Sequence, residues 1–209
     1  MQIYTYDIRK LNNDEYLKWY SMMSDERRMR VDAFRYEDDR KRSVAGEMLA
    51  RKAISEMCNI TPESIIFKRT QHGKPYTSLA EFNISHSEDI VVCAVDKTPV
   101  GIDVEKIRPV NLRTAKKVFS QNEINYLFGH TPEENEFTQT DNTEILNRFF
   151  ELWTKKEAVG KCVGTGLIHE ENYDNYNIET FIVKDEYTVS VCQKKKQLTV
   201  TDEQQLLSE

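Results

Sequence analysis

Two carboxylates lie two residues apart in the segment Gly-Ile-Asp-Val-Glu at residues 101–105. The β-branched neighbours favour a strand, and side chains two apart on a strand project from one face, about 7 Å from each other. Asp103 and Glu105 could therefore bind a cation together. These residues alone also allow a second interpretation, in which both carboxylates form the solvent-facing edge of a half-buried strand.

A second group of side chains that could take part in binding or catalysis lies on a long predicted helix that ends near Val163. At about 100° per residue, two aromatic rings and two charged side chains fall within one sector of this helix: Phe150, Trp153, Glu157 and Lys161. Glu157 and Lys161 could line a site there. They are also spaced i,i+4, and an ordinary ion pair on the helix surface, worth about 0.3 to 0.5 kcal/mol, is the alternative.

Lys156 is predicted to lie inside the apolar arc of the same helix, between Leu152 and Val159. An unpaired ammonium would be strongly unfavourable there, so we expect Lys156 to have a partner. Gly160 lowers helix stability by about 1 kcal/mol relative to alanine. It indicates either the close approach of backbone or ligand, or no particular role.

Weaker signals precede these two segments. Gly-Lys-Pro at residues 73–75 is an ordinary turn sequence that contains Lys74. Phe-Asn-Ile-Ser-His-Ser at residues 82–87 ends a predicted strand with Ser85 and His86, and a lone histidine more often has a structural role. Residues 27–52 hold nine basic and five acidic side chains, on a chain whose formal net charge is −6. Such a local cationic patch suits a small polyanion better than nucleic acid.

Helical and strand patterns that hold these residues follow one another along the chain. Helices are expected to begin near Asp14, Asp25 and Asp38, and to cover residues 112–119 and 122–128. Asp141, with Glu144 three residues on, is expected to cap the long helix, and Gly164 to end it. Strands are expected at residues 2–7, 65–68, 82–86, 90–95, 100–105, 178–183 and 187–192, with a loop at 131–143 and a frayed tail from Thr201. The mixture predicts an α+β fold with antiparallel pairing.

Composition restricts the class of protein further. A chain of 209 residues that is 39% hydrophobic can bury a core of its own. No apolar run approaches the roughly 20 residues that a membrane span needs, and the N-terminus lacks the pattern of a signal peptide. The four cysteines form no CxxC pair, which predicts buried free thiols. We therefore expect a cytosolic protein that binds neither membranes nor nucleic acid.

Taken in order along the chain, four segments resemble the motif series of the Sfp-type 4′-phosphopantetheinyl transferases: Gly-Lys-Pro, Phe-Asn-Ile-Ser-His-Ser, Gly-Ile-Asp-Val-Glu and Trp-Thr-Lys-Lys-Glu-Ala-Val-Gly-Lys. Residues 24–54 are similar to that family as well. The resemblance implies two similar α+β subdomains related by a pseudo-twofold axis, residues 1–99 and 100–209. It also implies a monomer with coenzyme A in the cleft between them. Sequence periodicity gives no independent support for such a repeat.

The resemblance also implies roles for individual residues. Magnesium, or manganese in its place, would be bound by the acids Asp103, Glu105 and Glu157, whose oxygens suit a hard divalent ion. Lys161 and His86 would contact phosphates of coenzyme A and, with Glu157, form the catalytic set. The other coenzyme A contacts that it implies are Arg27, Arg30, Arg42 and Ser43 at the 3′-phosphate and adenosine end, and Lys74, Ser85 and Asp103 along the nucleotide.

The implied reaction moves the 4′-phosphopantetheine group of coenzyme A to a serine of an apo acyl, peptidyl or aryl carrier protein. We hypothesise that Glu157, directly or through a water, accepts the serine proton while Lys161 stabilises the departing phosphate. Two other interpretations remain: a metal-dependent phosphodiesterase, and a catalytically inactive module that binds coenzyme A or a carrier protein. The sequence does not indicate whether fatty-acid, polyketide or nonribosomal peptide synthesis is served.

Overall fold

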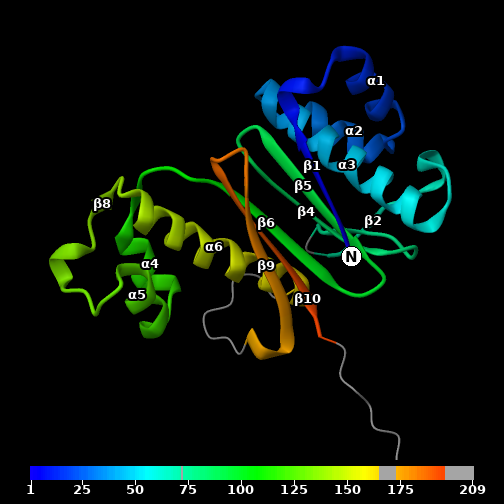
Figure 1. Ribbon diagram of the computed structural model, residues 1–209. Coiled ribbons are helices and arrows are strands. Elements are labelled where there is room, and N and C mark those ends of the chain that lie inside the picture. The colour runs from blue at the N-terminus through cyan, green and yellow to red at the C-terminus, as the bar shows by residue number, and fades with distance from the viewer. Residues whose placement is uncertain (72, 165–172, 196–209) are drawn as a thin grey trace, which may run out of the picture.

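The computed structural model describes residues 1–71, 73–164 and 173–195, and it confirms the expected α+β fold (Figure 1). Two three-stranded antiparallel sheets pack against each other, and a long helix covers the outer face of each. The helices therefore hold their inward side chains against the two sheets. Within the described residues no helix has the length and apolarity that a membrane crossing requires.

The first sheet has the strand order β1-β5-β4, with β1 (Gln2–Asp7), β4 (Glu81–Ser87) and β5 (Ile90–Asp96). Between β1 and β4 the chain forms three helices: α1 (Asn13–Ser21), α2 (Asp25–Asp32) and α3 (Glu37–Cys58). A short ribbon of β2 (Lys68–Arg69) and β3 (Pro75–Tyr76) follows α3, and 3₁₀ turns lie at Ile8–Lys10 and Pro62–Ser64. Side-chain oxygens of Asn12 and Ser24 cap α1 and α2, which fixes where these helices begin.

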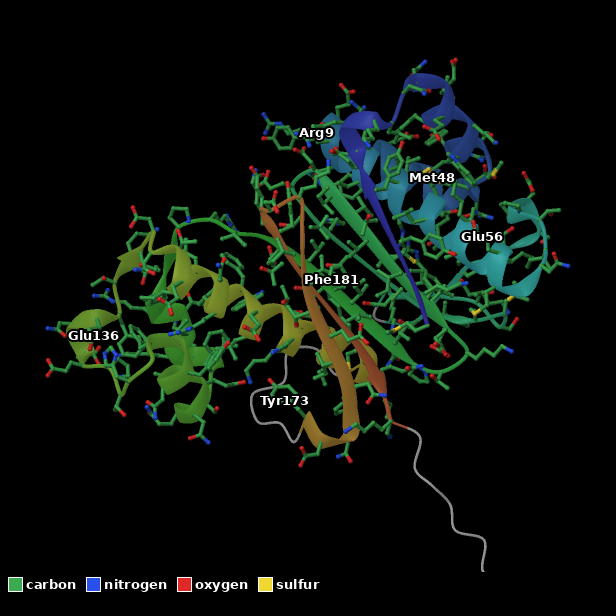
Figure 2. All side chains as sticks on the ribbon, viewed as in Figure 1. Arg9, Met48, Glu56, Glu136, Tyr173 and Phe181 are labelled. Atoms are coloured by element: carbon green, nitrogen blue, oxygen red, sulfur yellow. The ribbon has the colours of Figure 1, made fainter. Side chains whose placement is uncertain are left out.

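Helix α3 packs its apolar stripe on the outer face of the first sheet. Val44, Met48 and Ile54 are completely buried there, against Val91 and other β5 side chains. Met48, labelled on α3 in Figure 2, belongs to this layer between helix and sheet. Because the apolar residues recur at helical spacing, the opposite edge of α3 is free to present polar side chains.

The second sheet has the strand order β6-β10-β9, with β6 (Val100–Lys106), β9 (Tyr176–Val183) and β10 (Tyr187–Lys194). Its outer face is covered by α6 (Thr143–Val163). Gly101 permits a very close contact there, because a Cβ at this position would lie 1.9 Å from the carbonyl oxygen of Ala158 in α6. The remaining short elements are β7 (Val110–Asn111), α4 (Ala115–Val118), α5 (Gln121–Phe128), β8 (Gln139–Thr140), and 3₁₀ turns at Leu112–Thr114, Glu134–Glu136 and Tyr173–Asn175.

Helices α4 and α5 lie at one end of α6 (Figure 1), and a buried ion pair ties α5 to it. The ammonium of Lys156, which is 1% exposed, lies 3.1 Å from Glu123 Oε2. Glu123 also completes the capping box of α5 with Ser120. The expectation that Lys156 has a partner is therefore confirmed.

The two halves of the chain repeat one topology. Each begins with a strand, continues through a long helix and ends with a hairpin, and in each sheet the last strand lies between the other two. The inner faces of both sheets form one apolar core, which includes Val92 of β5, Ile102 of β6 and Val189 of β10. Since this core is shared, the division at residues 99 and 100 into two subdomains stays a prediction.

The predicted strand at residues 65–68 is wrong for its first three residues. The guanidinium of Arg51 donates to the carbonyl oxygens of Pro62 and Ile65, at 2.8 and 2.9 Å, and this holds the segment against α3. Only the following Lys68–Arg69 forms a strand. A tertiary contact from a buried arginine therefore overrides the β propensity of the local sequence.

The predicted cap of the long helix is also wrong, by one residue. Asn142, rather than Asp141, caps α6, because its Oδ1 accepts a hydrogen bond from the backbone N–H of Ile145 at 3.1 Å. Glu144 pairs with Arg148 instead of completing a capping box. The expected loop at residues 131–143 contains a 3₁₀ turn and β8, which pairs with β7. The tail from Thr201 lies outside the described residues.

Candidate active site

Strands β4 and β6 lie side by side where the two sheets meet, and polar side chains join them. The hydroxyl of Ser85 donates to Asp103 Oδ1 at 2.8 Å, and that of Ser87 donates to Glu105 Oε2 at 3.1 Å. This spacing follows from the two-residue period of both strands, which turns alternate side chains toward the neighbouring strand. Both carboxylates are thereby held at one seam, and the interpretation of them as a solvent-facing edge does not apply to Asp103, which is 4% exposed.

Lys161, in the last turn of α6, reaches the same seam. Its Nζ lies 2.5 Å from Asp103 Oδ1 and 3.0 Å from Ser85 Oγ. The close packing of α6 on Gly101 brings this turn of the helix near enough for the contact. Lys161 therefore pairs with a carboxylate of β6, and not with Glu157 on its own helix.

The three acids identified from the sequence share an unfavourable electrostatic environment. Burial raises the pKa of Asp103, and Lys161 and Ser85 only partly offset this. Burial and then the negative charge of Asp103 raise the pKa of Glu105 and that of Glu157. Because Asp103 contributes to both shifts, Glu105 and Glu157 each lie within electrostatic reach of Asp103. An added positive charge would stabilise all of them.

The chemistry of the seam fits a divalent cation. Asp103 Oδ2 is buried and has no hydrogen-bond partner among the described residues, so one carboxylate oxygen is left for a ligand. Carboxylate oxygens are the ligands that magnesium prefers. Within residues 1–71, 73–164 and 173–195, however, no three His, Cys, Asp or Glu side chains are already gathered closely enough to hold a metal. The convergence of the three acids on one ion therefore stays a prediction.

A cavity of about 580 Å³ lies between α2, α3, the β2–β3 ribbon and β4. Its inner wall is apolar, with Phe67, Phe82 and Ile84 among the lining residues. Its polar lining includes Arg27, Arg42, Ser43, His86, Lys68 and Arg69. An apolar wall beside several cations suits a ligand that has both a ring and negative charge.

Most of the guanidinium groups around this cavity are already paired. Arg27 donates to Glu47 at 3.1 Å and to Ser43 Oγ at 2.6 Å. Arg42 donates to Asp39 at 2.5 Å. These contacts fix the side chains in place, so that an entering anion would meet a pre-arranged wall. Arg30 is exposed and pairs with Glu26, which itself lines the cavity.

His86 connects the cavity to the acidic seam. It lines the cavity, and its neighbours on β4 are the two serines that contact the carboxylates. Partial desolvation, then the positive charges of Arg42 and Lys161, lower its pKa. His86 therefore stands between a cation of α3 and a cation of α6, and both cations favour the neutral form of its ring.

The structure thus gathers most of the site residues named from the sequence. Lys74 also reaches this region, since its Nζ lies 3.2 Å from the carbonyl oxygen of Lys161. Sequence reasoning missed Ser87, although its place two residues after Ser85 could have indicated it. It also missed Arg69, which lies in a two-residue strand without a recognisable pattern. The roles of all these residues in catalysis or binding stay proposals.

Two family profiles match this chain in succession. Residues 10–98 match the family described as 4′-phosphopantetheinyl transferase, N-terminal. Residues 99–206 match the 4′-phosphopantetheinyl transferase superfamily. Together the two matches cover the second sheet, the strands β4 and β5 of the first sheet, the cavity and the acidic seam.

Curated proteins from bacilli are similar over much of the chain. The 4′-phosphopantetheinyl transferase Sfp of Bacillus subtilis strain 168 is 36% identical over 171 residues, which are 80% of this chain and 72% of that protein. The 4′-phosphopantetheinyl transferase ffp of Bacillus subtilis is 32% identical over 216 residues, with 92% of each chain covered. The 4′-phosphopantetheinyl transferase gsp of Aneurinibacillus migulanus is 38% identical over 130 residues, 62% of this chain and 51%, about half, of that protein.

Proposed function

Because the chain belongs to the 4′-phosphopantetheinyl transferase superfamily, we propose that it transfers the 4′-phosphopantetheine group of coenzyme A to a serine hydroxyl of an apo carrier protein. One observation carries the proposal beyond the family. The cavity has several arginines and an apolar wall, the seam holds carboxylates whose charge is only partly compensated, and His86 lies between the two. A nucleotide with a phosphate at one end and a pyrophosphate at the other needs both regions.

The cavity is proposed to hold the adenosine and 3′-phosphate end of coenzyme A. Its apolar wall would contact the base, and Arg27, Arg42 and Ser43 would face the phosphate. The pyrophosphate would then extend past His86 toward Ser85 and Lys161, whose side chains already meet at the seam. In this arrangement the substrate is oriented along β4, and its reacting phosphorus lies near the acids.

The chemical step is a displacement at the β-phosphorus. The carrier serine oxygen forms a new bond to this phosphorus, while the bond to the bridging pyrophosphate oxygen breaks and releases adenosine 3′,5′-bisphosphate. Glu157 accepts the serine proton, directly or through a water. Lys161 stabilises the charge that grows on the leaving phosphate.

Magnesium, or manganese, is proposed to act together with coenzyme A. Asp103, Glu105 and Glu157 would hold the ion, and it would offset the negative charge of the pyrophosphate when bound. The unpaired Oδ2 of Asp103 supports this assignment. Lys161 would remain beside Asp103 and share its charge.

The proposal includes the setting in which the protein works. It would act as a monomer in the cytosol and contact its carrier protein only transiently. An acyl, peptidyl or aryl carrier protein would supply the serine.

Carrier modification tests the proposal directly. The protein is incubated with coenzyme A, magnesium chloride and a panel of apo acyl and peptidyl carrier proteins, and intact mass is measured. We expect at least one carrier to gain the mass of one phosphopantetheine group, with release of adenosine 3′,5′-bisphosphate in equal amount. A parallel reaction with a chelator should lose this activity.

Two outcomes would contradict the transferase assignment. Cleavage of coenzyme A with no gain in carrier mass would indicate a phosphodiesterase. Calorimetric binding of coenzyme A that proceeds without turnover on any carrier, and that a chelator leaves unchanged, would indicate an inactive binding module.

A further inference from the structure

Arg69 differs from the other arginines that surround the cavity. It lies in β2, lines the cavity and is half-buried. Its Nη1 donates to the carbonyl oxygen of Gly73 at 2.5 Å, across the β2–β3 ribbon. A neutral carbonyl thus holds the side chain in place without neutralising its charge.

Every neighbouring guanidinium, in contrast, has a carboxylate partner. Arg27 and Arg51 share Glu47, and Arg42 pairs with Asp39. Among the residues that the structure describes, Arg69 makes no ion pair. An anion that enters the cavity would have to compete with carboxylates for the paired arginines, whereas Arg69 offers its charge without such competition.

The surroundings of Arg69 favour an anion. Partial burial, then the positive charges of Arg27 and Arg30, lower its pKa, and they outweigh the opposite influence of Glu26 and Glu47. Among the charges that act on Arg69, those of Arg27 and Arg30 act most strongly. A planar guanidinium can bind two oxygens of one phosphate at once, which a point charge does not do.

The anion that fits this corner is a phosphate monoester. The acidic seam lies at the far side of His86, so the pyrophosphate has its own place near Lys161. Phe67 and Phe82 line the same cavity as Arg69, and a base would pack against their rings. A phosphate carried close to that base, on the ribose, would reach the guanidinium.

We propose that Arg69 binds the 3′-phosphate of coenzyme A and is the residue that makes this protein prefer coenzyme A to dephospho-coenzyme A. This inference rests on the proposed function and extends it to a specificity-determining side chain. Arg69 is remote from the reacting phosphorus. It should therefore act on substrate affinity and not on the rate of the chemical step.

Calorimetric titration of Arg69→Gln with coenzyme A and with dephospho-coenzyme A tests the inference. We expect the affinity for coenzyme A to fall about tenfold to hundredfold, since a charge-assisted hydrogen bond is lost, and the affinity for dephospho-coenzyme A to change by less than about twofold. In the carrier assay, KM for coenzyme A should rise by the same factor while kcat stays near that of the wild type. Arg113→Gln removes an exposed arginine from the other half of the chain and should change neither affinity.

Arg69→Lys gives a second measurement if Arg69→Gln does not fold. It keeps the positive charge but loses the planar fork, so discrimination between the two nucleotides should be weakened by an intermediate factor. Two outcomes would overturn the assignment of Arg69 if the variant has the melting temperature of the wild type. Either the affinity falls equally for coenzyme A and dephospho-coenzyme A, or it falls for neither. Failure of the wild-type protein to bind coenzyme A at all would instead overturn the proposed function, and this inference with it.

Discussion

Helices α3 and α6 each cover a three-stranded sheet, and each carries charged side chains into a buried place. On α3 the carboxylate of Glu47 lies between Arg27 and Arg51, with contacts of 3.1 and 2.9 Å. On α6, Glu157 is half-buried and makes no hydrogen bond or ion pair within the described part of the chain, and its pKa is raised. The charge of Glu47 on α3 is compensated, whereas that of Glu157 on α6 is not.

This difference separates structural from functional charges. A compensated ion pair such as Glu47 with Arg51 keeps a cavity wall in one shape, and its removal mainly affects stability. An under-compensated acid such as Glu157 lowers stability slightly, and a fold keeps it only where a substrate or cation completes its surroundings. Variants in the two helices should therefore fail in different ways.

The largest expected effect is on transfer activity and concerns α6. Glu157→Gln and Lys161→Ala should each lower the rate of carrier modification by about 10²- to 10⁴-fold, because proton acceptance or charge stabilisation is lost. Thermal unfolding of Glu157→Gln should occur no lower than that of the wild type, because the variant removes a disfavoured charge. Glu151→Gln, on the same helix but paired with Lys155, is the matched control and should retain its activity. Near-normal turnover of either site variant would remove its assignment.

On α3 the expected effect is on stability. Glu47→Gln should lower the free energy of unfolding by about 3 to 5 kcal/mol, because the buried Arg51 loses its counter-charge. Urea unfolding followed by tryptophan fluorescence measures this change. Glu37→Gln, which breaks an exposed pair with Lys41 on the same helix, should change stability by less than about 0.5 kcal/mol. Similar losses of unfolding free energy in Glu47→Gln and Glu37→Gln would mean that burial does not determine how much each ion pair contributes to stability.

Two glycines test how tightly each helix packs on its sheet. At Gly101 a Cβ would meet the backbone of α6 at 1.9 Å, whereas at Gly46 the nearest atom would be a side-chain methyl of Ile84 at 3.2 Å. Gly101→Ala should therefore destabilise by about 2 to 3 kcal/mol and also reduce transfer, since α6 must move and carry Lys161 with it. Gly46→Ala should stay within about 1 kcal/mol of the wild type, because the helix preference for alanine offsets a small shift. Equal melting temperatures of Gly101→Ala and Gly46→Ala would contradict the inferred difference in helix packing.

Local patterns were sufficient to predict most helices and strands and the shared face of Asp103 and Glu105. Strong periodicity and short turns determine these features within a few residues of the chain. The cap of α6 was missed by one residue, because Asp141 and Asn142 are equally good caps locally. The strand predicted at residues 65–68 is absent from its first three residues, because a hydrogen bond from Arg51 restrains that segment.

The seam between β4 and β6 could not be predicted from local patterns. It depends on side chains that replace a backbone ladder, such as Asn83, whose Oδ1 accepts from the backbone N–H of Ile102 at 2.9 Å. Only the ordered resemblance to a family brought Ser85, Asp103 and Lys161 together beforehand. The resemblance did not indicate Arg69 either. Its proposed role depends on a difference in ion pairing: the neighbouring arginines pair with carboxylates, and Arg69 makes no ion pair within the described residues.

The smallest expected effect concerns His86, which stands between the cations of α3 and α6. Its pKa in the folded protein is lowered from the ordinary value of about 6.5. Below about pH 6.5, His86 binds a proton in the unfolded chain but not yet in the folded chain. The free energy of unfolding should therefore fall as the pH decreases through about 6.5. His86→Gln should lose less stability than the wild type between pH 7.5 and 5.5. The difference should be below about 1 kcal/mol, because the ring keeps an exposed edge that water screens.

Urea unfolding at three pH values in this range measures that difference. Arg42→Gln should reduce it, since one of the two charges that lower the pKa of His86 is then absent. Lys161→Ala should reduce this difference as well. The two variants together compare how strongly a charge on α3 and a charge on α6 lower the pKa of His86. An unchanged pH dependence in His86→Gln would show that neither cation acts on His86. The cavity and the acidic seam would then be electrostatically separate, and a single nucleotide spanning both would lose its main physical support.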